Sequence, residues 1–138
     1  MNQIAILHPV IAMAALTFIV LLLIPYQRFK AVIRKQVVPD DFKFGESESV
    51  PQAVCIPNRN YMNLLELPLL FYVVCVVMFV TQTVTPTAVG LAWAYVALRS
   101  VHSLIHLTYN KVVHRLTFFA LSNVVLVVLW ISLVANLE

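Results

Sequence analysis

The sequence predicts an all-α integral membrane protein that folds as a bundle of four transmembrane helices. Of its 138 residues, 62% are hydrophobic and only 11% are charged, whereas a soluble domain has about 45–50% apolar and about 25% charged residues. Each of the four apolar runs is close to the roughly 20 residues that a helix needs to cross a hydrocarbon core. These runs cover residues 4–25, 64–80, 89–107 and 116–135.

The helices are expected at about residues 4–35, 59–82, 86–109 and 114–136, in one membrane domain that covers residues 1–138. The first continues past Pro25 into the basic segment YQRFKAVIRKQ, whose cations can reach lipid headgroups while their stems lie on apolar surface. A cytoplasmic loop at about residues 36–58 follows, and Asn58 is suited to cap the second helix. Pro86 suits the start of the third.

The positive charges predict the orientation in the membrane. All nine lysines and arginines lie in or near the first and third connections. The N-terminus, the second connection and the C-terminus contain none. By the positive-inside rule, the first and third connections face the cytoplasm and both termini face the other side. The net charge of +3 therefore reflects one basic membrane face, and no nucleic-acid partner is expected.

Two polar faces interrupt the apolar helices. In RNYMNLLE, the residues Arg59, Asn63 and Glu66 fall within roughly a 60° arc of one helix face at about 100° per residue. On the third helix, LRSVHSLIHLTYNK places Arg99 and three further polar side chains within about an 80° arc. Charged groups inside a membrane normally face a bundle interior or a wet cavity. The third-helix set is Arg99, His102, His106 and Tyr109.

These faces allow two interpretations. A buried Glu66–Arg99 ion pair could fix the register of the helices. Alternatively, the same layer forms a pocket for a small anionic ligand, because Arg59, Arg99 and Arg115 outnumber the single carboxylate. A buried excess of positive charge is unfavourable unless an anion completes it, and guanidinium groups suit carboxylates.

No metal site is expected. His102 and His106 have a suitable i, i+4 spacing, but no third ligand is evident. Cys55 and Cys75 do not form a C-x-x-C pair and are expected to be free.

The polar residues resemble the pattern of a known family, the membrane-associated proteins in eicosanoid and glutathione metabolism (MAPEG). Its second helix carries Arg-x3-Asn-x2-Glu, matched by Arg59, Asn63 and Glu66. Its third helix carries Arg-x2-His, matched by Arg99 and His102. The resemblance covers nearly the whole chain, including the four-helix plan.

Further positions strengthen this resemblance. In the family, an arginine at the start of the fourth helix activates the thiol, sixteen residues after the third-helix arginine, and Arg115 matches it. The tripeptide Pro39-Asp40-Asp41 is similar to the Pro-Glu-Asp of several members. The segment NLLELPLLFY is most similar to the short bacterial branch related to microsomal glutathione transferase. This similarity implies that the protein lies in a bacterial inner membrane.

The resemblance implies a homotrimer with glutathione, a co-substrate, bound between neighbouring subunits and open to the cytoplasm. Arginines would meet its two carboxylates, Glu66 its ammonium group, and Arg115 its thiolate, as the catalytic residue. The implied glutathione-binding residues are Arg59, Asn63, Glu66, Arg99, His102, His106 and, from the first helix, Arg28 or Lys30.

Three positions depart from the family pattern. His106 stands where many members have a tyrosine, so this contact to glutathione is changed. Leu116 and Phe119 replace the serine and tyrosine of the prostaglandin synthase branch, which argues against prostaglandin synthesis.

We therefore expect a glutathione-dependent membrane transferase or peroxidase that conjugates or reduces a small lipophilic electrophile. The alternative is a non-catalytic trimeric membrane protein that binds an anionic ligand or a lipid headgroup in the same arginine-rich pocket. A transporter has less support, because four helices without a sign of a discontinuous helix offer little for alternating access.

Overall fold

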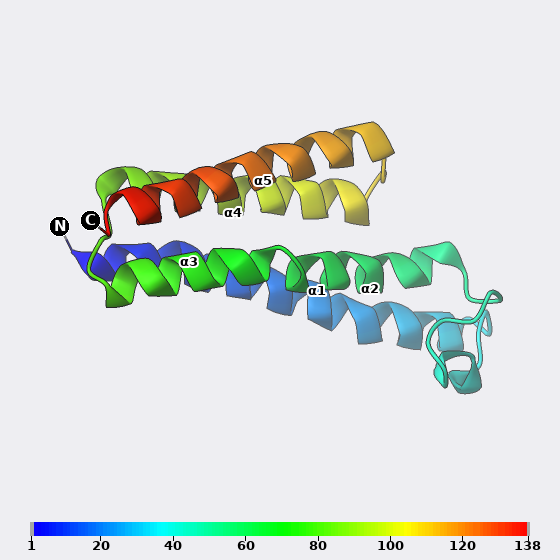
Figure 1. Ribbon diagram of the computed structural model, residues 1–138. Coiled ribbons are helices and arrows are strands. Elements are labelled where there is room, and N and C mark those ends of the chain that lie inside the picture. Colours follow the sequence, from blue (N-terminus) through cyan, green and yellow to red (C-terminus); the bar gives the residue numbers. More distant parts are fainter. Residues whose placement is uncertain (1, 138) are drawn as a thin grey trace.

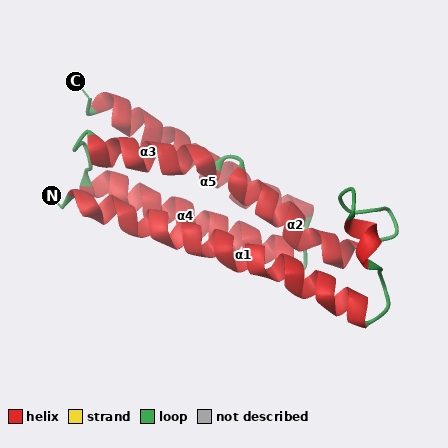
Figure 2. Cartoon of the chain, turned by 90° about the horizontal axis from the view of Figure 1, so that it is seen from below, coloured by secondary structure: helices red, strands yellow, loops and turns green. Residues whose placement is uncertain are grey.

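The protein is built from long helices that run side by side, and a computed structural model describes residues 2–137 (Figures 1 and 2). The described part contains helices and connections but no strand. The predicted all-α membrane fold with four transmembrane helices is confirmed, while the two end residues of the predicted domain lie outside the described part. The helical segments long and apolar enough to cross a membrane are Gln3–Ile33, Gln52–Val80, Pro86–Leu107 and Val112–Ala135.

The four spans contain five α-helices, because the second span is divided. The first span begins with a short 3-10 turn, η1, which leads into α1, and another 3-10 helix, η2, lies in the connection that follows. The elements are η1 (Gln3–Ile6), α1 (Leu7–Ile33), η2 (Pro39–Phe42), α2 (Gln52–Leu65), α3 (Pro68–Val80), α4 (Pro86–Leu107) and α5 (Val112–Ala135).

The two ends of the bundle differ in charge. Figure 1 shows both chain ends and the α3–α4 connection at one end, and the α1–α2 and α4–α5 connections at the other. All lysines and arginines lie in or near these last two connections, so we call this the basic end. Helix α4 packs along α5, and α1 packs along α2.

Helix α2 begins earlier than the sequence predicts. It starts at Gln52 rather than near residue 59, so Asn58 lies inside the helix and does not cap it. Val54 and Cys55 in its first turn are buried in a small apolar cluster with Ala31 at the end of α1. Pro57 lies inside α2 and removes one backbone hydrogen bond of the helix. The free energy gained by burying Val54 and Cys55 offsets this loss.

The second span is interrupted at Glu66, whereas the sequence predicts one continuous helix at residues 59–82. The backbone of Glu66 leaves the helical conformation, with φ −81° and ψ −99°. Pro68 has no N–H to donate to the carbonyl of Leu64, and its ring clashes with a helical carbonyl at that position. Helix α3 then restarts with Pro68 in its first turn. The expectation of no discontinuous helix is therefore wrong.

The acidic tripeptide before α2 organises the connection. Pro39-Asp40-Asp41 lies in η2. The carboxylate of Asp41 accepts hydrogen bonds from the backbone N–H of Val38 at 2.9 Å and from the hydroxyl of Ser49 at 3.2 Å. These contacts give the tripeptide a structural role within the loop.

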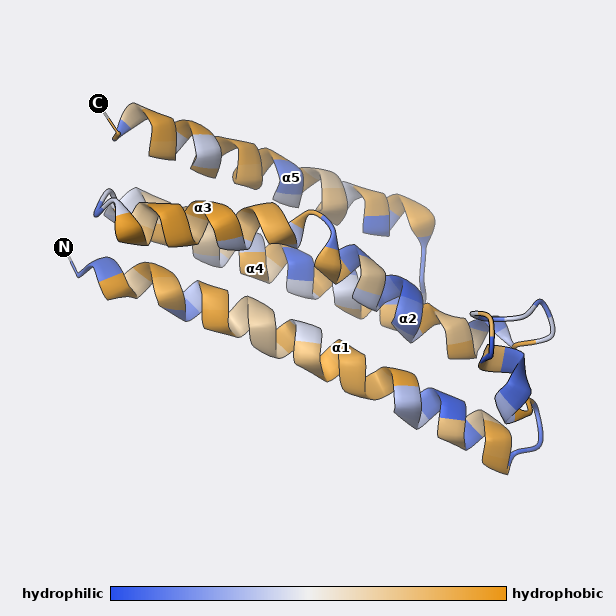
Figure 3. Ribbon diagram, turned by 60° about the horizontal axis from the view of Figure 1, so that its bottom comes forward, coloured by the Kyte–Doolittle hydropathy of each residue, from blue (hydrophilic) through white to orange (hydrophobic). Residues whose placement is uncertain are grey.

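The main core joins all four spans. Phe71 of α3 and Tyr95 of α4 are fully buried, and their rings stack with centroids 4.5 Å apart. Much of the remaining apolar surface stays exposed on the outside of the helices, as the hydrophobic colouring of α1, α3 and α5 in Figure 3 illustrates. An apolar exterior of this extent marks a surface that contacts lipid.

The ring of Phe71 is expected to contribute strongly to stability. Phe71→Ala should lower the free energy of unfolding by about 3–5 kcal/mol, because it leaves a cavity against Tyr95. The measurement is unfolding in mixed micelles, followed by circular dichroism. Phe18→Ala is the control, since Phe18 is 64% exposed and should change little. Equal losses in the two variants would contradict this packing.

Candidate functional site

A buried arginine occupies the break between α2 and α3. Arg99 of α4 is fully buried, and its Nη2 donates a hydrogen bond of 2.7 Å to the backbone carbonyl of Asn63, near the end of α2. The last carbonyls of a helix lack donors within the helix, and a cation is favourable at this negative end of the helix dipole. Arg99 therefore caps α2 from the side.

The other guanidinium nitrogens of Arg99 have no hydrogen-bond partner among the described residues. Its Nε and Nη1 are buried and make no hydrogen bond to any described residue. The guanidinium carbon lies 5.5 Å from the ring centre of Phe119. The Glu66–Arg99 ion pair is not formed, because the described residues hold a single ion pair, Arg28–Glu46, at 3.5 Å.

A second set of contacts ties α4 to the start of α5. His102 Nδ1 lies 3.0 Å from the backbone carbonyl oxygen of Arg115. Arg115 Nη1 in turn donates a hydrogen bond of 2.7 Å to Asn110 Oδ1 in the α4–α5 connection. Asn110 has a φ of +48°, a left-handed conformation that asparagine tolerates better than most residues. The tight turn therefore helps to hold the Arg115 side chain.

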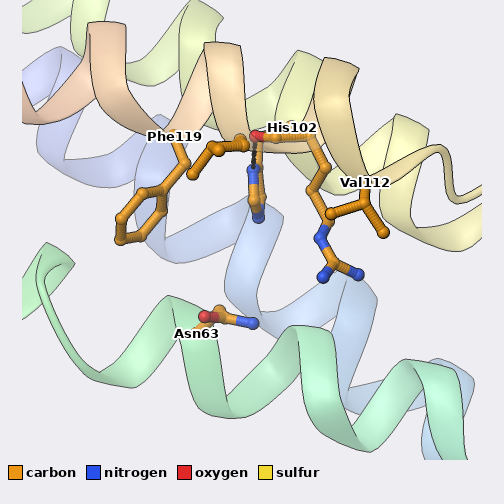
Figure 4. Close-up of a pocket in the computed structure, with 6 residues that line it drawn as sticks. Asn63, His102, Val112 and Phe119 are labelled. Atoms are coloured by element: carbon orange, nitrogen blue, oxygen red, sulfur yellow. Dashed lines mark hydrogen bonds between the residues drawn. The ribbon is translucent and has the colours of Figure 1, made fainter.

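These residues enclose a cavity of about 200 Å³ near the basic end (Figure 4). In Figure 4, Asn63 lies on one side and His102 and Phe119 on the other. The wall combines an amide, an imidazole and a guanidinium with apolar side chains. A typical pocket for a drug-sized ligand has about 300–1,000 Å³, so this cavity is smaller than such a pocket. The lining residues are Asn63, His102, Val112, Arg115, Leu116 and Phe119.

The other predicted residues of α2 and α4 lie nearby in different environments. Arg59 and Glu66 are exposed on α2, and the side chain of Asn63 donates to the carbonyl of Arg59 at 3.0 Å. His106 is buried, with its ring 6.0 Å from that of His102, but it does not line the cavity. The described residues contain no group of three histidine, cysteine, aspartate or glutamate side chains that could hold a metal ion.

The candidates on α1 are not brought to this cavity within one chain. Arg28 lies over the ring of Phe42 at 4.6 Å and pairs with Glu46. Lys30 lies 5.7 Å from the ring centre of Tyr26. Both belong to separate cavities near the α1–α2 connection.

Sequence reasoning missed a pair of buried polar residues, Asn60 and Ser103. Asn60 is fully buried, and its Oδ1 accepts a hydrogen bond of 3.2 Å from the hydroxyl of Ser103 on α4. Its Nδ2 makes no hydrogen bond to the described residues. The available signal was an asparagine and a serine in facing membrane helices, a pairing that commonly joins such helices.

The comparison with protein families decides the identity of the fold. The MAPEG family model matches residues 6–135, which cover nearly all of the four spans and every residue of the cavity. The chain is a member of the MAPEG family. The family predicted from the polar residues is therefore confirmed. No curated protein and no solved structure matches the chain.

The left-handed backbone at Asn110 of this MAPEG protein can be tested by two substitutions. Asn110→Ala should lower the free energy of unfolding by about 1–2 kcal/mol relative to Asn110→Gly, because a Cβ without a polar partner is disfavoured at positive φ. Both variants lose the bond to Arg115, so unfolding in mixed micelles isolates the backbone effect. Equal stabilities would show that this turn does not constrain the connection.

Proposed function

We propose that this MAPEG protein is a glutathione-dependent membrane transferase or peroxidase that acts on a small lipophilic electrophile. The observation that carries the proposal is the cavity where the guanidinium of Arg115, the imidazole of His102 and the amide of Asn63 converge. Membership of the family is consistent with glutathione-related activity. We assign Arg115 the catalytic role and glutathione the role of co-substrate.

The chemistry requires a thiolate, and Arg115 is suited to stabilise it. A guanidinium close to sulfur favours the charged form of the thiol. Asn110 engages Nη1, and no described residue bonds to the other guanidinium nitrogens of Arg115. These nitrogens are available to a ligand in the cavity.

A homotrimer completes the site in this proposal. Arg59 and Glu66 are exposed on a transmembrane helix, where lipid contact with charge is costly. A neighbouring subunit would cover this face and contribute Arg28 or Lys30, which lie outside the cavity in one chain. Together these groups provide cations for the two carboxylates of glutathione and a carboxylate for its ammonium group.

The electrophile arrives from the bilayer and glutathione from the cytoplasm. Val112, Leu116 and Phe119 give the cavity an apolar wall, and Leu116 is 61% exposed on the outside of the bundle. The basic end is assigned to the cytoplasm by the positive-inside rule. Both termini then lie on the opposite side, and the proposed location is a bacterial inner membrane.

The test is an ultraviolet difference spectrum of glutathione added to the purified protein at neutral pH, together with turnover of an electrophile. Wild type should show a thiolate band. Arg115→Ala should lose the band and lower turnover by at least about 100-fold, the usual effect of removing one charge-stabilising donor. Lys111→Ala removes a neighbouring exposed cation and should change neither.

An absent band together with absent saturable glutathione binding would contradict the proposal. The non-catalytic alternative would then apply. In that case Arg59→Ala, Arg99→Ala and Arg115→Ala should weaken the binding of an anionic lipid to similar extents.

A further inference from the structure

The hydrogen bond of His102 fixes which ring nitrogen carries the proton. Nδ1 lies 3.0 Å from the carbonyl oxygen of Arg115, and a carbonyl can only accept, so Nδ1 is the donor. A neutral imidazole has one N–H and one lone pair. The lone pair of His102 is therefore on Nε2.

The Nε2 atom has no partner and points toward the cavity. The residue is only 3% exposed, and Nε2 bonds to no described residue. Figure 4 shows the ring extending from α4 toward Asn63 on α2, with the bonded nitrogen on the far side. A buried acceptor without a donor is unfavourable. A ligand that presents a donor at this position would satisfy it.

We propose that His102 is the general base that removes the thiol proton of glutathione, an inference that rests on the proposed function. The S–H bond breaks, and its proton forms an N–H bond on Nε2. The resulting thiolate lies beside Arg115 and forms an S–C bond with an activated alkene, while the C=C π bond breaks and its electron pair becomes a carbanion on the neighbouring carbon. The imidazolium then returns the proton to the carbanion of the adduct, so that His102 is restored and nothing else is consumed.

His102 is held in place in the way that general bases usually are. The base is held by a third group, here the backbone carbonyl of the residue that stabilises the thiolate. His102 also sits between two helices whose relative position the same bond fixes. His106 provides a contrast, because it is equally buried but does not line the cavity.

The surrounding charges favour a proton transfer from the thiol to His102 inside the site. His102 lies near Arg99 on its own helix and Arg115 on α5, and its ring is 6.0 Å from that of His106. The charged side chains on the facing helix α2 are the exposed Arg59 and Glu66. Arg99 and Arg115 disfavour an isolated imidazolium. A proton moved from sulfur to Nε2 creates an anion together with the cation, so the total charge of the site does not change.

The variant His102→Asn tests the inference in the full-length protein. An asparagine amide can replace the Nδ1–H donor to Arg115 but has no basic nitrogen. With glutathione and a nitroalkene at pH 7, kcat/KM should fall by about 100-fold or more, while the Kd of glutathione changes less than about threefold. The deficit should shrink above about pH 8.5, where a free thiol ionises unaided.

His8→Asn, at an exposed histidine near the start of α1, is the matched control and should keep the wild-type rate and pH profile. A wild-type rate in His102→Asn, or a deficit that is the same at every pH, would overturn the assignment. The latter result would mean that His102 only supports the structure.

Proton release from wild type tests the same step without a variant. Glutathione is added at neutral pH in weak buffer, and a pH indicator is followed together with the thiolate band. The band should appear with no proton released, because Nε2 holds it. One proton released per thiolate formed would overturn the role of His102 and leave the proposed function intact. Without saturable glutathione binding, both proposals fail.

Discussion

The hydrogen bond from Arg99 to the carbonyl of Asn63 is the interaction on which the candidate site depends. Pro68 prevents a continuous second span, but a proline alone does not decide the outcome, since Pro25 lies inside α1 without interrupting it. What differs at the break is a fully buried guanidinium that supplies a donor to the end of α2 at 2.7 Å. The break and its cap therefore stabilise each other.

The same arginine orders the residues that face the cavity. His102 follows Arg99 by one turn of α4. The position of Arg99 against α2 therefore also determines how closely the His102 imidazole approaches α2. The bond from His102 to the carbonyl of Arg115 extends this order to α5, and Asn110 holds the Arg115 side chain. One set of contacts thus links α2, α4 and α5 around the cavity.

Much of the fold was predictable because its determinants are local. The apolar runs and the clustering of positive charges in two connections follow from composition along the chain, and the family follows from Arg59, Asn63, Glu66, Arg99, His102 and Arg115. Pro68 is a local signal for the break at Glu66, but the donor that caps α2 comes from Arg99, 36 residues after Asn63, so no local pattern reveals the cap. Likewise, the early start of α2 depends on burial against Ala31 at the end of α1, and the tautomer of His102 depends on a carbonyl of α5.

Hydrogen exchange at the break tests the role of Arg99 most directly. Amide exchange between residues 64 and 72 would be compared in wild type and Arg99→Met, with Arg59→Met as the control for an exposed arginine on α2. We expect exchange at these amides to accelerate at least about tenfold in Arg99→Met, because a hydrogen bond from a charged donor contributes about 1.5–3 kcal/mol. Exchange in Arg59→Met should match wild type. Unchanged exchange in Arg99→Met would show that α2 ends at Glu66 without help from Arg99, and would contradict the central role of this hydrogen bond.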